Sequence, residues 1–156
     1  MTKFDWYECN VKYNKTANGE KPITEVYLLQ ANSYADAEDK VIHLVHTYND
    51  IPNLEILDIK KRRFLDVIVE GDYEGDLYYK ARVLIYEMDE NSGVEKVKSS
   101  NVIVRAKNLA EAMRIAEDNL KETIEDYELH TVGLTNIVEA IIYTEDEPAL
   151  HSVQFA

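Results

Sequence analysis

The sequence contains little of what marks several large protein classes. Of its 156 residues one is cysteine, four are histidine, three are proline and five are glycine. A single thiol, Cys9, cannot form an internal disulfide, and the scattered histidines have no metal-ligand spacing. We therefore expect neither a disulfide scaffold nor a structural zinc site, and no cofactor.

Long apolar runs are also missing. No stretch approaches the roughly 20 apolar residues that span a bilayer, and Met1-Thr2-Lys3-Phe4-Asp5-Trp6 lacks the layout of a secretory signal. We expect a soluble, cytoplasmic protein that does not bind membranes. With 46% hydrophobic and 10% aromatic residues, the chain contains enough apolar material to bury a core.

Positive charge is scarce. The chain has 17 basic and 30 acidic residues, a formal net charge of −13 and a pI near 4.7. This charge disfavours binding to duplex DNA, which depends on neutralising phosphates, and it favours solubility and cationic partners. The simplest interpretation is a solvated acidic surface.

The chain resembles itself at an offset of 72 to 75 residues. The matched segments are 6–11 with 78–83, 30–37 with 105–112, 55–59 with 128–132, and 64–69 with 137–142. Similar segments in the same order at nearly constant spacing indicate an internal repeat. We predict repeats at 4–70 and 77–143 within a single domain, 1–156, with a C-terminal tail at 144–156.

Each repeat has the pattern of a hairpin, a helix and one or two further strands. Aromatic and β-branched residues favour hairpin strands at 4–14 and 23–31 around Asn18-Gly19, and at 77–89 and 96–106 around Asn91-Ser92-Gly93. Capping boxes at Ser33 and Asn108 predict helices at 33–48 and 108–125. Further strands are expected at 54–59, 64–70, 127–132 and 136–143.

The predicted fold is therefore α+β. Two pseudo-symmetric β-β-α-β(β) repeats fuse into one domain, with the helices packed on a common or continuous, largely antiparallel sheet. Helical periodicity places one apolar face of each helix against the sheet. The residues expected there include Val41, Leu44, Val45, Met113, Ala116 and Leu120.

Catalytic patterns are weak. The sequence lacks the glycine-rich nucleotide loops, the nucleophile elbow and the His-Glu-x-x-His zinc motif. His43 and His46 have a spacing that can bring two imidazoles to one metal, but no third ligand accompanies them, so we interpret them as helix-surface residues. Cys9 has the pattern of a buried strand residue. We expect no enzyme; the alternative is a site built from scattered acids and tyrosines.

A basic cluster stands out in this acidic chain. Lys60-Lys61-Arg62-Arg63 lies between two predicted strands, and its counterpart Gly133-Leu134-Thr135-Asn136 carries no charge. The cations either pair with acids of the fold or form a surface for an anion, a nucleic acid or an acidic protein. Because strand residues alternate between faces, a shared face for all four requires a bend between residues 59 and 64.

Aromatic residues are the second candidate for a binding surface. Trp6, Tyr7, Tyr78 and Tyr79 lie on predicted strands. An exposed sheet face that carries them beside a cationic edge would stack single-stranded bases. Packing in the core and across strands is the simpler interpretation, because sheets favour aromatic residues.

Several of these segments carry a resemblance to a known family. They are Trp6-Tyr7-Glu8-Cys9-Asn10-Val11-Lys12-Tyr13, Thr24-Glu25-Val26-Tyr27-Leu28, Ser33-Tyr34-Ala35-Asp36-Ala37-Glu38, Ile59-Lys60-Lys61 and Tyr78-Tyr79-Lys80-Ala81-Arg82-Val83. Over residues 5–143 the chain resembles a family of about this length from Bacteroidetes bacteria and their phages, a domain of unknown function. The resemblance implies a Bacteroidetes host cell or a phage virion as the setting, and it identifies no catalytic residue.

These observations leave functional hypotheses of different classes. The leading one is a non-catalytic interaction or assembly protein, such as a phage-encoded virion component or a modulator of a host protein, that binds a protein partner or itself through a sheet edge or an aromatic face. The alternative is a single-stranded nucleic-acid-binding protein that uses the basic cluster and strand tyrosines. The negative net charge opposes the second hypothesis.

Overall fold

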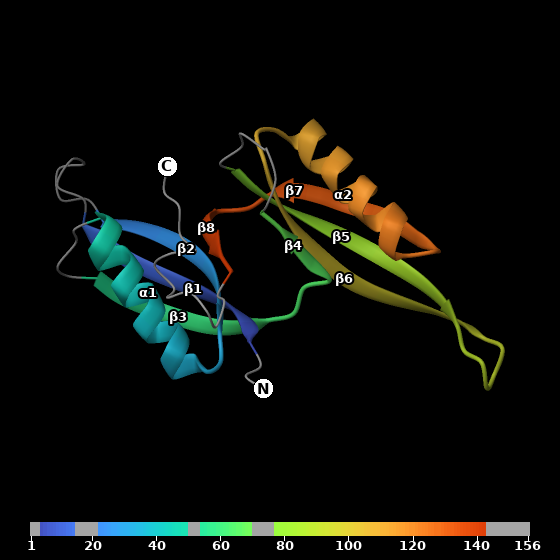
Figure 1. Cartoon of the computed structure of the whole chain (residues 1–156), viewed down its shortest axis with the longest axis horizontal. Helices are drawn as coiled ribbons and strands as arrows, with labels where there is room; N and C mark the ends of the chain where they lie inside the picture. The colour runs from blue at the N-terminus through green and yellow to red at the C-terminus, as the bar shows by residue number, and fades with distance from the viewer. Residues whose placement is uncertain (1–3, 15–21, 50–53, 70–76, 143–156) are drawn as a thin grey trace. The chain divides into compact units, whose positions relative to one another are not determined.

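The computed structural model describes residues 4–14, 22–49, 54–69 and 77–142 (Figure 1). It has the predicted α+β class, with two helices and two mixed sheets of four strands each. The predicted turn Asn18-Gly19 and the predicted tail 144–156 lie outside the described residues. Contacts divide the chain into two compact units, one formed by Met1–Arg62 with Asn136–Ala156 and the other by Arg63–Thr135.

The elements follow the predicted order, and their ends lie within a few residues of the expected positions. They are β1 (Asp5–Asn14), β2 (Pro22–Ala31), α1 (Tyr34–Asn49), β3 (Leu54–Arg62), β4 (Asp66–Ile68), β5 (Leu77–Met88), β6 (Glu95–Ala106), α2 (Leu109–Thr123), β7 (Tyr127–Leu134) and β8 (Ile137–Ile141).

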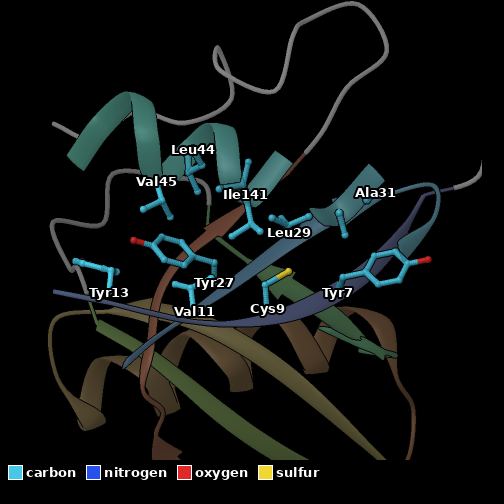
Figure 2. Close-up of a cluster of buried hydrophobic side chains, with 12 residues drawn as sticks. Tyr7, Cys9, Val11, Tyr13, Tyr27, Leu29, Ala31, Leu44, Val45 and Ile141 are labelled. Carbon is cyan, nitrogen blue, oxygen red and sulfur yellow. The ribbon is translucent and has the colours of Figure 1, made fainter. Parts of the chain in front are cut away.

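The first unit has a sheet of order β3-β1-β2-β8, covered on one face by α1 (Figure 1). β1 pairs antiparallel with both β2 and β3, whereas β8 pairs parallel with β2. Alternate residues of the strands point to the helix and form a core with α1, as Figure 2 shows. Ile141, from β8, packs into this core beside Leu29.

The second unit has the same arrangement in its own sheet. Its order is β4-β6-β5-β7, with antiparallel pairing of β5 to β6 and β7, and parallel pairing of β4 to β6. A core between this sheet and α2 includes Ala81, Val83, Val102 and Val104. The register of the first strand shifts by one residue against the strand that follows the helix in both sheets, after Asn10 and after Arg82.

The short fourth strand of each sheet comes from the other half of the sequence. β4 precedes the second hairpin but pairs within the second unit, and β8 follows β7 but pairs within the first. The expectation of a common or continuous sheet is therefore wrong, because the crossing strands complete two separate sheets instead. The superposition of 4–70 on 77–143, as repeats of a single domain, stays a prediction.

Both helices begin as the capping boxes predict. The Ser33 Oγ accepts a hydrogen bond from the Asp36 backbone N–H at 3.0 Å, and the Asn108 Oδ1 accepts one from Glu111 at 2.8 Å. The carboxylates of Asp36 and Glu111 reach back to the backbone N–H groups of Asn32 and Lys107, one residue before each cap. Each cap side chain thus satisfies a donor that the first helical turn leaves free, and each carboxylate satisfies a donor just before the cap.

The predicted core faces are confirmed at five of six positions. Val41, Leu44, Val45, Ala116 and Leu120 are buried, whereas Met113 is 43% exposed. Ile115, which the prediction left out, is buried in its place. The apolar stripe of α2 runs through Ala112, Ala116 and Leu120 at four-residue spacing, and Ile115 lies on the side of that stripe that faces the sheet.

This pair of residues gives a matched test of the core. We expect Ile115→Ala to lower the free energy of unfolding by about 2–5 kcal/mol, because it removes buried methyl groups and leaves a cavity. Met113→Ala on the same helix should change it by less than about 0.5 kcal/mol. Urea denaturation of both variants measures the difference, and equal losses would show that the assigned face of α2 is incorrect.

Candidate functional site

The basic cluster lies at an edge of the first sheet. Lys60, Lys61 and Arg62 are the last residues of β3, and Arg63 follows the strand. The register shift against β1 falls opposite Asn10 and Val11, before the cluster, and the pairing runs without interruption through the three cations. Lys60 and Arg62 therefore lie on one face and Lys61 on the other, so the structure does not bring the four cations onto one surface.

Two of the four cations pair with acids of β1. Lys61 Nζ lies 3.2 Å from an Asp5 carboxylate oxygen, and an Arg62 guanidinium nitrogen lies 3.2 Å from Glu8. The cationic side chains are 44% and 42% exposed, so water screens both pairs. Within the described ranges, the exposed Lys60 and Arg63 form no ion pair.

The predicted aromatic residues are mostly core residues. Tyr7 is 2% exposed, Tyr78 1% and Tyr79 6%, and Trp6 is half-buried. The Tyr7 ring makes an edge contact with Tyr34, with centroids 5.0 Å apart. In the β1–β3 register Trp6 lies opposite Arg62 and Tyr7 opposite Lys61, whereas Tyr78 and Tyr79 belong to the other unit. Packing explains these tyrosines, and no base could stack on their buried rings.

The candidate catalytic side chains do not converge. Cys9 is fully buried, and burial, followed by the negative charges of Asp58 and Glu8, raises the pKa of its thiol from 9.0 to about 12. Such a thiol is protonated at neutral pH and is a poor nucleophile. His43 and His46 lie exposed on α1, and among the described residues no group of three or more His, Cys, Asp or Glu could hold a metal.

One polar network lies inside the first unit. The hydroxyls of Tyr13 and Tyr27 both donate to the carboxylate of Glu25, the latter at 3.2 Å, and burial with this contact raises the pKa of Tyr13. A shallow depression at the same end of the sheet is lined by residues of β1 and β3, among them Lys12, Tyr13 and Glu55. Because both hydroxyls already donate to Glu25, the network has the character of a structural contact.

The far end of the β5–β6 hairpin has a different character. β5 and β6 pair over their whole length, from Leu77 to Met88, but β7 pairs only with Tyr79–Ile85 and β4 only with Val102–Val104. Figure 1 shows the hairpin continuing beyond the start of β7, where Tyr127 pairs with Ile85. We call residues 84–99 the distal hairpin; its outer part is a two-stranded ribbon within the part of the chain that the structure describes.

The two faces of the distal hairpin differ in polarity. One face of the hairpin is the face that packs against α2 nearer the core. On the distal part of this face, Lys98 pairs with Glu87 at 3.1 Å and Lys96 with Asp89 at 3.3 Å. The opposite face carries Tyr86, Met88 and Val97 together with one acid, Glu95; Tyr86 lies directly across from Val97, and Met88 across from Glu95. Met88 is 64% exposed, Val97 55%, and Val94 beside the turn 59%.

Polar contacts alone order the turn of this hairpin. Asp89 Oδ1 accepts from the Asn91 backbone N–H at 3.0 Å, and Gly93 donates to the Asp89 carbonyl at 2.8 Å. Gly93 has a φ of 71°, a conformation that side chains disfavour. The Asn91 contact, followed by Lys96, lowers the pKa of Asp89. The exposed apolar residues are therefore not needed to form the turn.

Sequence reasoning missed this surface, although a signal for it was present. The predicted hairpin strands, 77–89 and 96–106, are clearly longer than the predicted strands 127–132 and 64–70. That difference in length predicts an overhang with only two strands. The apolar residues on the overhang then cannot all be buried in the core of the unit.

The ion pairs of β3 provide a test of the basic cluster. We expect Lys61→Ser and Arg62→Ser each to lower the free energy of unfolding by at most about 1 kcal/mol, and less in high salt, because the pairs are half-exposed. Lys60→Ser and Arg63→Ser are the matched controls and should have no effect. Urea denaturation at low and high salt measures this; a larger, salt-independent loss in the controls would contradict the assignment.

Comparisons with known proteins show the family but no activity. The family model described as Domain of unknown function (DUF4494) matches residues 5–144, which is most of the chain. No curated protein is significantly similar to it. Neither helix in the described ranges has the length and apolar character to cross a membrane. The chain belongs to the DUF4494 family, a domain of unknown function.

Proposed function

We propose that this protein is a non-catalytic interaction protein that binds another protein through its distal hairpin. The observation that carries the proposal is the exposure of Met88, Val94 and Val97 on a ribbon outside both helix-side cores. Exposed apolar side chains grouped on one element are typical of protein interaction sites.

The energetics of burial support a protein partner. Covering a Val or Met side chain completely contributes roughly 1.5–3 kcal/mol, so a partner that covers these residues gains several kcal/mol before the cost of association. The ordered turn around Gly93 reduces that cost, because the surface is already formed in the free protein. The ion pairs on the opposite face keep the ribbon amphipathic.

The alternative of single-stranded nucleic-acid binding has less support. It rests on Lys60 and Arg63, and the net charge of −13 opposes it. The tyrosines that would stack bases are buried. A phage virion or a Bacteroidetes cytoplasm as the setting rests on the sequence resemblance alone.

Site-specific photo-crosslinking tests the proposal. A photoreactive residue at Val97 should capture a protein partner in the source cells, because the partner covers this side chain. The matched control is the same residue at Lys121, which is exposed on α2, on the other side of the sheet from Val97. Capture at Val97 should fall at least tenfold when Met88→Ser and Val94→Ser are introduced, as measured by the yield of one defined band.

Two results of this experiment would contradict the proposal, and a third would favour the alternative function. Equal capture from Val97 and Lys121, or capture at Val97 that survives both serine substitutions, would contradict the proposal. Capture of nucleic acid in place of protein would favour the alternative function. Circular dichroism of each variant shows that the fold is intact, since neither Met88 nor Val94 contributes to a core.

A further inference from the structure

We infer that the partner contributes an extended strand, with alternating apolar and acidic side chains, that pairs with the open edge of β6 at residues 95–99. This inference rests on the proposed function and specifies the partner's chemistry. It follows from the direction of the backbone groups of β6 and from the side chains on either face.

The backbone of β6 presents free groups along this edge. On the β4 side, the Asn101 carbonyl accepts from the Leu65 N–H at 2.7 Å, and β4 then pairs with Val102–Val104. Successive strand residues direct their backbone groups to opposite edges, so Val97 and Ser99 point to the same side as Asn101. Within the described ranges, no strand pairs with them there.

The other side of the hairpin confirms this alternation. The Tyr86 N–H donates to the Asp126 carbonyl at 3.1 Å, on the side of β7. Even-numbered residues of β5 therefore bond toward β7, and odd-numbered ones such as Ile85 bond toward β6. Ile85 lies opposite Lys98, so even-numbered residues of β6 bond to β5 and odd-numbered ones face outward.

The side chains define what an added strand must carry. A neighbour on this edge meets Val97 on one face, between Glu95 and Ser99 and beside Tyr86 of β5, which favours an apolar residue next to Val97. On the other face it meets Lys96 and Lys98, whose side chains are 62% and 65% exposed. Each ammonium has three donors and pairs with one acid, Glu87 of β5 or Asp89 directly after it, so an acidic residue in the added strand also finds a donor.

A second copy of this chain fits the edge less well. Antiparallel pairing of two β6 strands centred on Val97 places Lys96 opposite Lys98 of the other copy, and like charges directly opposite destabilise a sheet. The chemistry therefore favours a strand from a different protein over self-association.

Defined peptides test the inference without knowledge of the natural partner. The probes are two capped heptapeptides, one alternating Val with Glu and one alternating Val with Lys. Fluorescence anisotropy with the full chain should show at least tenfold tighter binding of the Val/Glu peptide. Amide hydrogen exchange should show at least tenfold slower exchange at Val97 and Ser99 on binding, with Lys96 and Lys98 unchanged because they already bond to β5.

Variants separate backbone pairing from simple apolar contact. Val97→Pro removes an outward N–H without breaking a bond to β5 and should abolish peptide binding, whereas Val97→Thr keeps the N–H and should retain it. Lys96→Glu combined with Lys98→Glu should reverse the preference toward the Val/Lys peptide. Melting curves establish that the variants fold, and the charge reversal serves as the test if the proline variant does not.

The outcomes distinguish this inference from the proposed function. Equal affinity for the two peptides, or binding that leaves the Val97 and Ser99 amides unprotected, overturns strand pairing. A partner captured at Val97 that does not protect these amides supports the proposed function and overturns the inference. Loss of specific capture at Val97, with protection by the Val/Glu peptide intact, overturns the proposed function and leaves the edge chemistry standing.

Discussion

The parallel pairings of β4 with β6 and of β8 with β2 are the constraint on which the rest of the structure depends. Each joins a strand from one half of the sequence to a hairpin from the other, so each sheet needs both halves to have its fourth strand. The pairings are short, and β4 has only three residues. This short strand protects one part of the β6 edge and leaves the rest of it open.

The interaction surface follows from the same hairpin that builds the core. Near β4 and β7, the residues of β5 and β6 that face α2 are Ala81, Val83, Val102 and Val104, all buried. Farther along, the same face carries Glu87 and Lys96, because α2 no longer covers it. The opposite face of the ribbon carries the exposed apolar residues Met88 and Val97, together with Glu95.

Local features could be predicted from the sequence because local interactions determine them. The caps at Ser33 and Asn108, the turn at Gly93 and the element order each depend on neighbours in the chain. The separate sheets could not be predicted, because strand partners far apart in sequence carry no local signal. Met113 was predicted to face the sheet but is exposed, because an apolar residue at the boundary of the apolar stripe of α2 can lie on either side of it. The basic cluster could be recognised from its composition. The face on which each cation lies depends on the strand register, which divides the cluster between two faces.

Amide hydrogen exchange in the free protein tests the open edge most directly. The account predicts alternation along the distal part of β6: the amides of Lys96 and Lys98 exchange slowly, because they bond to β5, while those of Val97 and Ser99 exchange at least tenfold faster. Residues 102–104, paired on both sides, should all be protected. Equal protection of Val97, Lys98 and Ser99 would contradict the account, since it would mean that the edge is already occupied.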